Sequence, residues 1–249
     1  MEPTPAEIAA AVQVKAQLDG IVVSIELTLV SIVQGSALGV LIATSIAPVT
    51  TLDWQWFPYI AVALLHILIF WSRAVVHTLS FISWPLDFTH NFLYVGVTLV
   101  EAWMISQLGD PSRWFLLNAV YSAAGVVLYK ADLDLVRRFS YDFRGEGARK
   151  LYDDILADQI LNVRFFMPAS FVFHLVCWWM IGRWPEVFLT DKWHVALGAY
   201  QVVVFGWYLW RGIPLIRRRQ GRIFQRLVDQ REGEHITVKK DESGMDIIG

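Results

Sequence analysis

The chain has 249 residues, of which 55% are hydrophobic, and its mean hydropathy is +0.44. This composition excludes an ordinary soluble domain, because several apolar runs reach about 20 residues, the length that spans a bilayer. The net charge of −2 at pH 7 is uninformative as a total, but the distribution of the charges is not. The single cysteine, Cys177, excludes an intramolecular disulfide and a cysteine-based metal cluster. We therefore expect an all-α, multi-pass membrane bundle.

The first segment, residues 1–20, is predicted to form a short amphipathic helix. Thr4, Pro5 and Glu7 have the spacing of a capping box with proline at the first helical position. This helix either lies on the membrane surface or extends the helix that comes after it. The segment lacks the pattern of a cleavable signal peptide, so we expect the first membrane helix to act as an uncleaved anchor.

Six membrane spans are predicted within residues 21–215. Their expected bounds are 21–47, 55–82, 85–108, 113–135, 163–182 and 192–215. Between the fourth and fifth spans, residues 148–161 predict an amphipathic cytoplasmic helix that lies under the bundle. Residues 216–249 form a tail that is basic at first and acidic later.

Lysine and arginine residues gather on one side of the predicted spans, in the linker after the fourth span and in the tail. By the positive-inside rule, both termini are cytoplasmic. Tryptophans are expected to mark the opposite interface: Trp54, Trp56, Trp114, Trp184 and Trp193. The single cysteine and compact loops fit a bacterial inner membrane. In the tail, Arg217, Arg218 and Arg219 either set the topology or bind anionic lipid.

Two spans carry continuous polar stripes. Residues seven apart lie about 20° apart around a helix axis, so a stripe of this spacing occupies one face. The second span carries Tyr59, His66, Arg73, His77 and Ser80. The third span carries Asp87, His90, Asn91, Tyr94, Thr98 and Glu101. Each charge at bilayer depth costs about 2.5–3.5 kcal/mol on insertion scales, so we expect these groups to have a use.

Depth along the helices predicts how the stripes pair. The very short turn near 83–85 makes the second and third spans antiparallel neighbours. This sets His66 level with Glu101, and His77 level with Asp87 and His90. Acid is thus expected to meet base at both ends of the paired stripes.

Other spans add polar residues at similar depths. Glu26 on the first span is level with Arg73, which predicts an ion pair, and Asn118 adds to the interior from the fourth span. Gly35 and Gly39 match the GxxxG pattern, which indicates either ordinary helix packing or a subunit interface.

These stripes favour a channel or transporter that moves protons or small ions along spans two to four. The predicted pathway residues are Glu26, His66, Arg73, His77, Asp87, His90, Asn91, Tyr94, Glu101 and Asn118. Histidine suits this role because small environmental effects move its titration across physiological pH. The competing interpretation is a static network that fixes the helix register.

Two further classes of function stay open. One is a non-catalytic scaffold or regulatory subunit that binds a protein partner through 148–161. The other is a metal-dependent membrane enzyme, with His77, Asp87 and His90 as weak candidate ligands and Glu26 or Asp132 as a further carboxylate. Catalytic and nucleotide-binding motifs are missing, so no cofactor and no catalytic residue is predicted. We expect a homo-oligomer that does not bind nucleic acid.

Overall fold

The computed structural model describes residues 4–81, 87–138, 146–214, 217 and 221, and all regular structure in these residues is helical. The main helices are α1 (Pro5–Thr50), α2 (Phe57–Phe81), α3 (Phe88–Ser106), α4 (Pro111–Arg138), α5 (Glu146–Leu161) and α6 (Met167–Arg183). Short segments are η1 (Trp54–Trp56), η3 (Asn162–Phe166) and η4 (Glu186–Thr190), the last two with π-helical bonding. A last helix covers 193–214.

Four helical stretches among the described residues are long and apolar enough to cross a membrane. They are Gln13–Thr50, Trp54–Leu79, Pro111–Arg138 and Arg149–Arg183. The fold is thus all-α and compatible with a multi-pass membrane protein. Helix α3 and the last helix are not among these four. Polar residues interrupt the apolar sequence of each, such as Glu101 in α3 and Gln201 in the last helix.

Helix α1 begins with the predicted capping box. The Thr4 N–H donates to Glu7 Oε2 at 2.7 Å, and the Glu7 N–H donates to Thr4 Oγ1 at 3.4 Å. The backbone and side-chain hydrogen bonds from Thr4 lower the pKa of Glu7. The helix then runs without a break for 46 residues, so the N-terminal segment extends the first apolar stretch.

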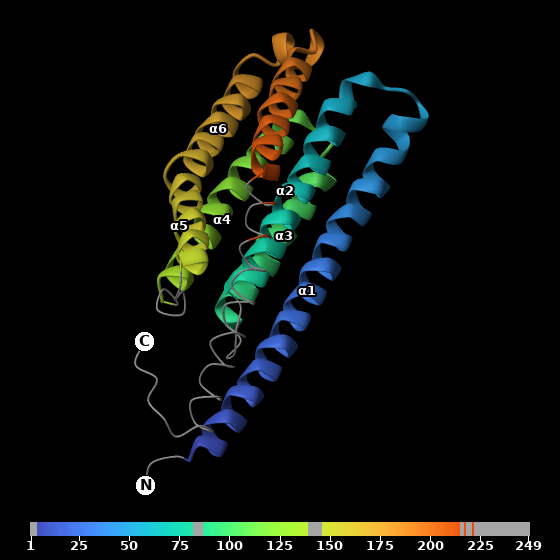
Figure 1. Cartoon of the computed structure of the whole chain (residues 1–249). Helices are drawn as coiled ribbons and strands as arrows, with labels where there is room; N and C mark the ends of the chain where they lie inside the picture. Colours follow the sequence, from blue (N-terminus) through green and yellow to red (C-terminus); the bar gives the residue numbers. More distant parts are fainter. Residues whose placement is uncertain (1–3, 82–86, 139–145, 215–216, 218–220, 222–249) are drawn as a thin grey trace.

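Helix α4 lies at the centre of the packing. It contacts α3, α5 and α6, while α1 contacts α2 and α3. In Figure 1, α1 runs along one edge of the bundle and the column of α5 and α6 along the opposite edge. The last helix closes the bundle between them: Tyr59 of α2 contacts His194 at its start, and Asn162 before α6 contacts Tyr208 in its later half.

The predicted helix at 148–161 exists, but its expected position under the bundle is wrong. Helix α5 continues into α6 through the five-residue π segment and packs beside α4. The reason is its apolar face, because Leu151 and Ile155 are buried against Val136 of α4 in a small core of their own. That face is therefore used within the chain.

One of the tryptophans expected at the membrane interface lies in the core. Trp54, Trp184 and Trp193 are exposed, whereas Trp114 is fully buried beside Tyr59 and Phe115. An indole N–H needs an acceptor when it is buried, and that requirement is met here inside the bundle. The prediction for Trp114 is therefore wrong.

Candidate functional site

Three buried side chains from three helices converge near one end of the bundle, and we call them the inner cluster: His77 of α2, His90 of α3 and Asp132 of α4. His90 Nδ1 lies 3.0 Å from Asp132 Oδ1, and His77 Nε2 lies 3.9 Å from the same oxygen. The two imidazole rings stack with their centroids 5.2 Å apart. One potential ligand atom from each residue lies within 4.8 Å of the other two.

Local helix geometry explains this convergence. Asp87 is the N-cap of α3, and its Oδ1 accepts the His90 backbone N–H at 3.1 Å. The cap fixes the first turn of α3, which carries His90 to the α4 side where Asp132 lies. The expected pairing of His77 with Asp87 is thus replaced by pairing with Asp132. Asp87 serves the backbone instead, because a helix start leaves N–H groups that need acceptors.

Glu26 of α1 lies on the same small cavity as the inner cluster. This cavity has a volume of about 30 Å³, room for about one water-sized particle, and its lining also includes Arg73 and Gln159. Glu26 is buried beside Asn91, and its Oε1 has no hydrogen-bond partner among the described residues. The cavity therefore brings a second carboxylate to the two histidines and Asp132.

Arg73 does not form the expected ion pair with Glu26. Its Nη1 lies 2.8 Å from Asp158 Oδ2 and its Nη2 lies 3.4 Å from Asp158 Oδ1, a two-point contact between α2 and α5. The guanidinium also lies over the rings of Tyr208 and Tyr129, 4.9 and 5.8 Å from their centroids. Arg73 and Glu26 line the same small cavity, but the Arg73 guanidinium pairs with Asp158 of α5.

The expected outer pair of His66 and Glu101 is also wrong. Glu101 is fully buried and faces α1, where Gln34 Nε2 donates to its Oε2 at 3.2 Å. His66 packs edge-on against Phe205 of the last helix at 4.4 Å and beside Tyr121 of α4 at 5.3 Å. The two stripes are thus neighbours in depth but point toward different helices.

Two further residues of the predicted pathway occupy packed positions. Tyr94 stacks on Phe70 at 5.0 Å, and Asn118 Nδ2 donates to the Trp114 carbonyl of its own helix at 2.9 Å. In the tail, Arg217 is exposed. The other two arginines of the predicted lipid site, Arg218 and Arg219, lie outside the described residues.

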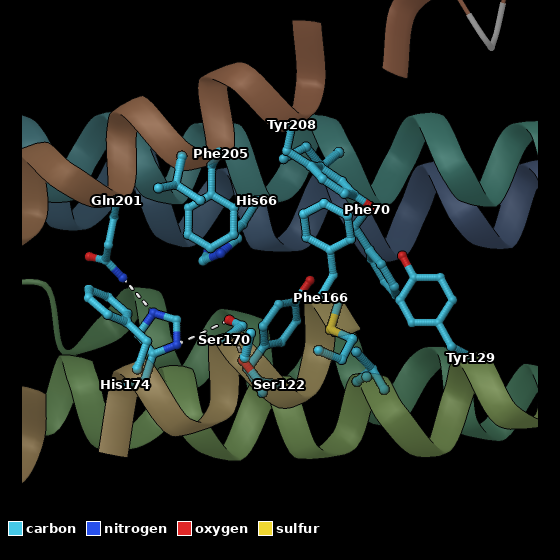
Figure 2. A pocket seen from close by; sticks show the side chains of 18 of the residues that line it. His66, Phe70, Ser122, Tyr129, Phe166, Ser170, His174, Gln201, Phe205 and Tyr208 are labelled. Atoms are coloured by element: carbon cyan, nitrogen blue, oxygen red, sulfur yellow. Dashed lines mark hydrogen bonds between the residues drawn. The ribbon is translucent and has the colours of Figure 1, made fainter. Parts of the chain in front are cut away.

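A directional hydrogen-bond chain links Trp114, Gln201, His174, Ser170 and Ser122, and Figure 2 shows its middle part. Trp114 Nε1 can only donate, so the Gln201 atom that it meets at 3.3 Å is the amide oxygen. Gln201 Nε2 then donates to His174 Nε2 at 2.6 Å, which leaves the His174 proton on Nδ1 to donate to Ser170 Oγ at 3.2 Å. Ser170 continues to Ser122 at 2.9 Å. His174 is therefore a satisfied, neutral histidine.

Sequence reasoning missed Asp158 and Gln159 near the site. The signal was present, because Asp158 follows Leu151 and Ile155 at helical spacing and so shares their inward stripe. Interpreting 148–161 as a surface helix hid that spacing. The sequence placed Asp132 on the polar face of the fourth span and as a further carboxylate for a metal, but not as the partner of His90, whose Nδ1 lies 3.0 Å from its Oδ1.

The inner cluster offers two imidazoles and one carboxylate at one point, with a second carboxylate on the shared cavity. Nitrogen and oxygen donors of this kind suit zinc, iron or manganese. Protein-family models, curated proteins and solved structures were all compared with this chain, and none of them matches it. The geometry of the cluster is therefore the strongest indication of its function.

Proposed function

We propose that the protein is a multi-pass membrane transporter for a small cation, with the inner cluster as its binding site and a first-row divalent metal as its cargo. The observation that carries this proposal is the convergence of buried His77, His90 and Asp132 from three helices, with ligand atoms within 4.8 Å of one another. A proton pathway is the competing cargo class. Compact convergence favours a metal, since a proton relay needs groups spread along the membrane normal.

Electrostatics support a cationic occupant. The short contacts of Arg73 are with Asp158, so its charge is matched locally. Glu26 and Asp132 then bring two carboxylates to one cavity of about 30 Å³. Removing carboxylates from water is costly unless a partner compensates them, and a divalent cation supplies that compensation. Fixing helix register alone would not require such costly groups.

The arrangement across the bundle favours a transporter over an open pore. At the opposite end of α3 from the cluster, the apolar side chains of Met104, Ile105 and Leu108 are buried and close the interior. A closed layer on one side of an ion site is typical of transporters that alternate access. We propose six crossings with both termini in the cytoplasm of a bacterial cell, because arginines such as Arg137 lie near the cluster end and exposed tryptophans such as Trp193 lie at the other.

A flux assay tests the proposal. The full chain is reconstituted in liposomes that contain a zinc-sensitive dye or, in a parallel arm, a pH-sensitive dye. Zinc entry is expected in wild-type vesicles and is expected to fall at least tenfold with Asp132→Asn. The matched control is Asp134→Asn, which changes an exposed carboxylate on the same helix and is expected to leave entry unchanged.

Each outcome of this assay decides between cargo classes. Proton flux without zinc flux, lost in Asp132→Asn, would overturn the metal cargo while keeping the pathway. Flux of neither ion through correctly folded protein would sink the transporter. Equal zinc entry with both variants would remove the inner cluster from the pathway.

A metal-dependent membrane enzyme is the second candidate, and one observation favours it. A larger cavity lies next to that of the inner cluster, and Phe70 and Tyr129 line both. Two histidines and one carboxylate are also the ligand set of many non-haem iron enzymes. Stoichiometric metal binding without any flux would favour this candidate over the transporter.

A further inference from the structure

We propose that the larger cavity binds a membrane-soluble molecule with a flat ring that carries hydrogen-bonding oxygens, of the quinone or quinol class. This second site is separate from the inner cluster and does not depend on the proposed cation transport. The cavity has a volume of about 250 Å³ and lies between α2, α4, α6 and the last helix (Figure 2). We call it the aromatic cavity.

Aromatic rings line the cavity on several sides. They include Phe70, Tyr121, Phe166, Phe173, Phe205 and Tyr208, from all of the surrounding helical segments. Phe166 and Tyr208 meet edge-on at 4.7 Å, as do His66 and Phe205 at 4.4 Å. Ring walls at these angles offer faces and edges to a further ring, which is the geometry that aromatic pairs prefer.

One buried polar atom on this wall has no partner. His66 is only 5% exposed, and its Nδ1 makes no hydrogen bond to any residue that the structure describes. Burying an imidazole nitrogen in this way costs free energy that a ligand oxygen or hydroxyl can recover. The Ser122–Ser170 pair supplies a second polar point on the cavity wall. The His66 nitrogen and the serine pair can hydrogen-bond the ring oxygens of a quinone, while the aromatic side chains pack against its ring.

The cavity reaches the outside of the bundle between α6 and the last helix. Two of its lining residues are exposed, Ala169 on α6 and Tyr200 on the last helix, the latter by 55%. The neighbouring exposed residues are apolar, among them Val172 and Val203. An apolar surface of this kind on a membrane helix faces lipid, so the ligand enters from the bilayer and its tail stays there.

Size and chemistry distinguish a ring from a lipid chain. Pockets that enclose drug-sized ligands measure about 300–1,000 Å³, so this cavity suits a single ring head with its tail outside. A saturated acyl chain gains nothing from the His66 nitrogen or the serine pair. The experiment must therefore distinguish binding of a quinone ring from binding of an acyl chain.

The test is equilibrium binding to the full chain in detergent micelles, with thermal unfolding as the readout. The probe is a benzoquinone with a decyl tail, and decylbenzene is its matched control without oxygens. We expect saturable stabilisation by the quinone, with decylbenzene at least tenfold weaker, since one hydrogen bond of ordinary strength corresponds to about a tenfold change.

Three variants locate the site. His66→Phe keeps a ring but removes the nitrogens, and it is expected to weaken the quinone about tenfold while leaving decylbenzene unchanged. Ala169→Phe narrows the opening and is expected to weaken both probes. Val172→Phe, which adds the same group to an exposed position of α6 outside the cavity lining, is the control expected to change nothing.

The outcomes are decisive in either direction. No saturable binding of the quinone to folded protein would overturn the site. Equal binding of both probes, with His66→Phe silent, would show a lipid-chain pocket and overturn the ring. Equal effects of Ala169→Phe and Val172→Phe would remove the cavity as the place of binding. These results leave the zinc-flux measurement untouched, so the two proposals can fail separately.

Discussion

Arg73 illustrates how a charged residue is accommodated inside the bundle. Its guanidinium meets Asp158 through two N–H groups and lies over Tyr208 and Tyr129. Both ends of the ion pair are largely shielded, with 18% and 12% of the side-chain surface exposed. The pair fastens α5 to α2, so its contribution extends beyond the two residues.

Removing one partner of this pair is expected to destabilise the fold. Asp158→Asn leaves the arginine charge without its counter-ion, and we expect a loss of roughly 3 kcal/mol in the free energy of unfolding. The double variant Arg73→Met with Asp158→Leu is expected to recover most of that loss, because no uncompensated charge remains. Thermal and chemical unfolding in detergent measure both. A single variant as stable as wild type would show that the pair contributes little.

The backbone conformation of Leu52 is unfavourable for a residue other than glycine. Its backbone φ is 51°, in the left-handed region, and the residue is 75% exposed in the turn between α1 and η1. Glycine adopts this conformation without the steric penalty of roughly 1–2 kcal/mol that a Cβ brings. Leu52→Gly should therefore raise the unfolding midpoint, and a lower midpoint would mean that the leucine side chain makes stabilising contacts.

At the scale of the helices, the existence of the main helices could be predicted from the sequence. Apolar length and the capping box predicted where α1 begins and that the fold is all-α. Some neighbours on different helices were also readable, since Glu26 and Arg73 line one cavity and His77 stacks on His90. The rotation of each helix about its axis was not, because it depends on which neighbour each face packs against. That is why Arg73 and Glu101 were given the wrong partners.

Helix α1 presents an outward face that carries Gly35 and Gly39. A Cβ placed at either glycine meets nothing within 4 Å, so neither glycine packs against another residue that the structure describes. Ordinary packing against the described helices is therefore not their role. A glycine inside a helix costs about 1 kcal/mol relative to alanine.

The double variant Gly35→Ala with Gly39→Ala is accordingly expected to be at least as stable as wild type as a monomer. Unfolding measurements and size-exclusion chromatography with light scattering check this. A drop in stability, or a change in the number of chains per particle, would contradict this expectation and would assign the face to the subunit interface that the GxxxG pattern also allows.

At the scale of the whole molecule, two sets of buried polar residues lie at two different cavities. The inner cluster and Glu26 lie around one small cavity, and the hydrogen-bonded chain from Trp114 to Ser170 lies beside the aromatic cavity. The sequence indicated a polar interior but not this division, because it arises from contacts with α5, α6 and the last helix. Only the folded structure shows that the inner cluster is a compact set of ligands and not part of a continuous polar stripe.

Equilibrium zinc binding is the decisive measurement for the inner cluster. Purified full-chain protein in detergent is dialysed to equilibrium with zinc, and bound metal is counted per chain for wild type, Asp132→Asn and Asp134→Asn. We predict one tightly bound zinc per chain in wild type and in Asp134→Asn, and loss of that zinc in Asp132→Asn. Folded wild-type protein without stoichiometric zinc, or equal binding by both variants, would contradict a cation site formed by His77, His90 and Asp132.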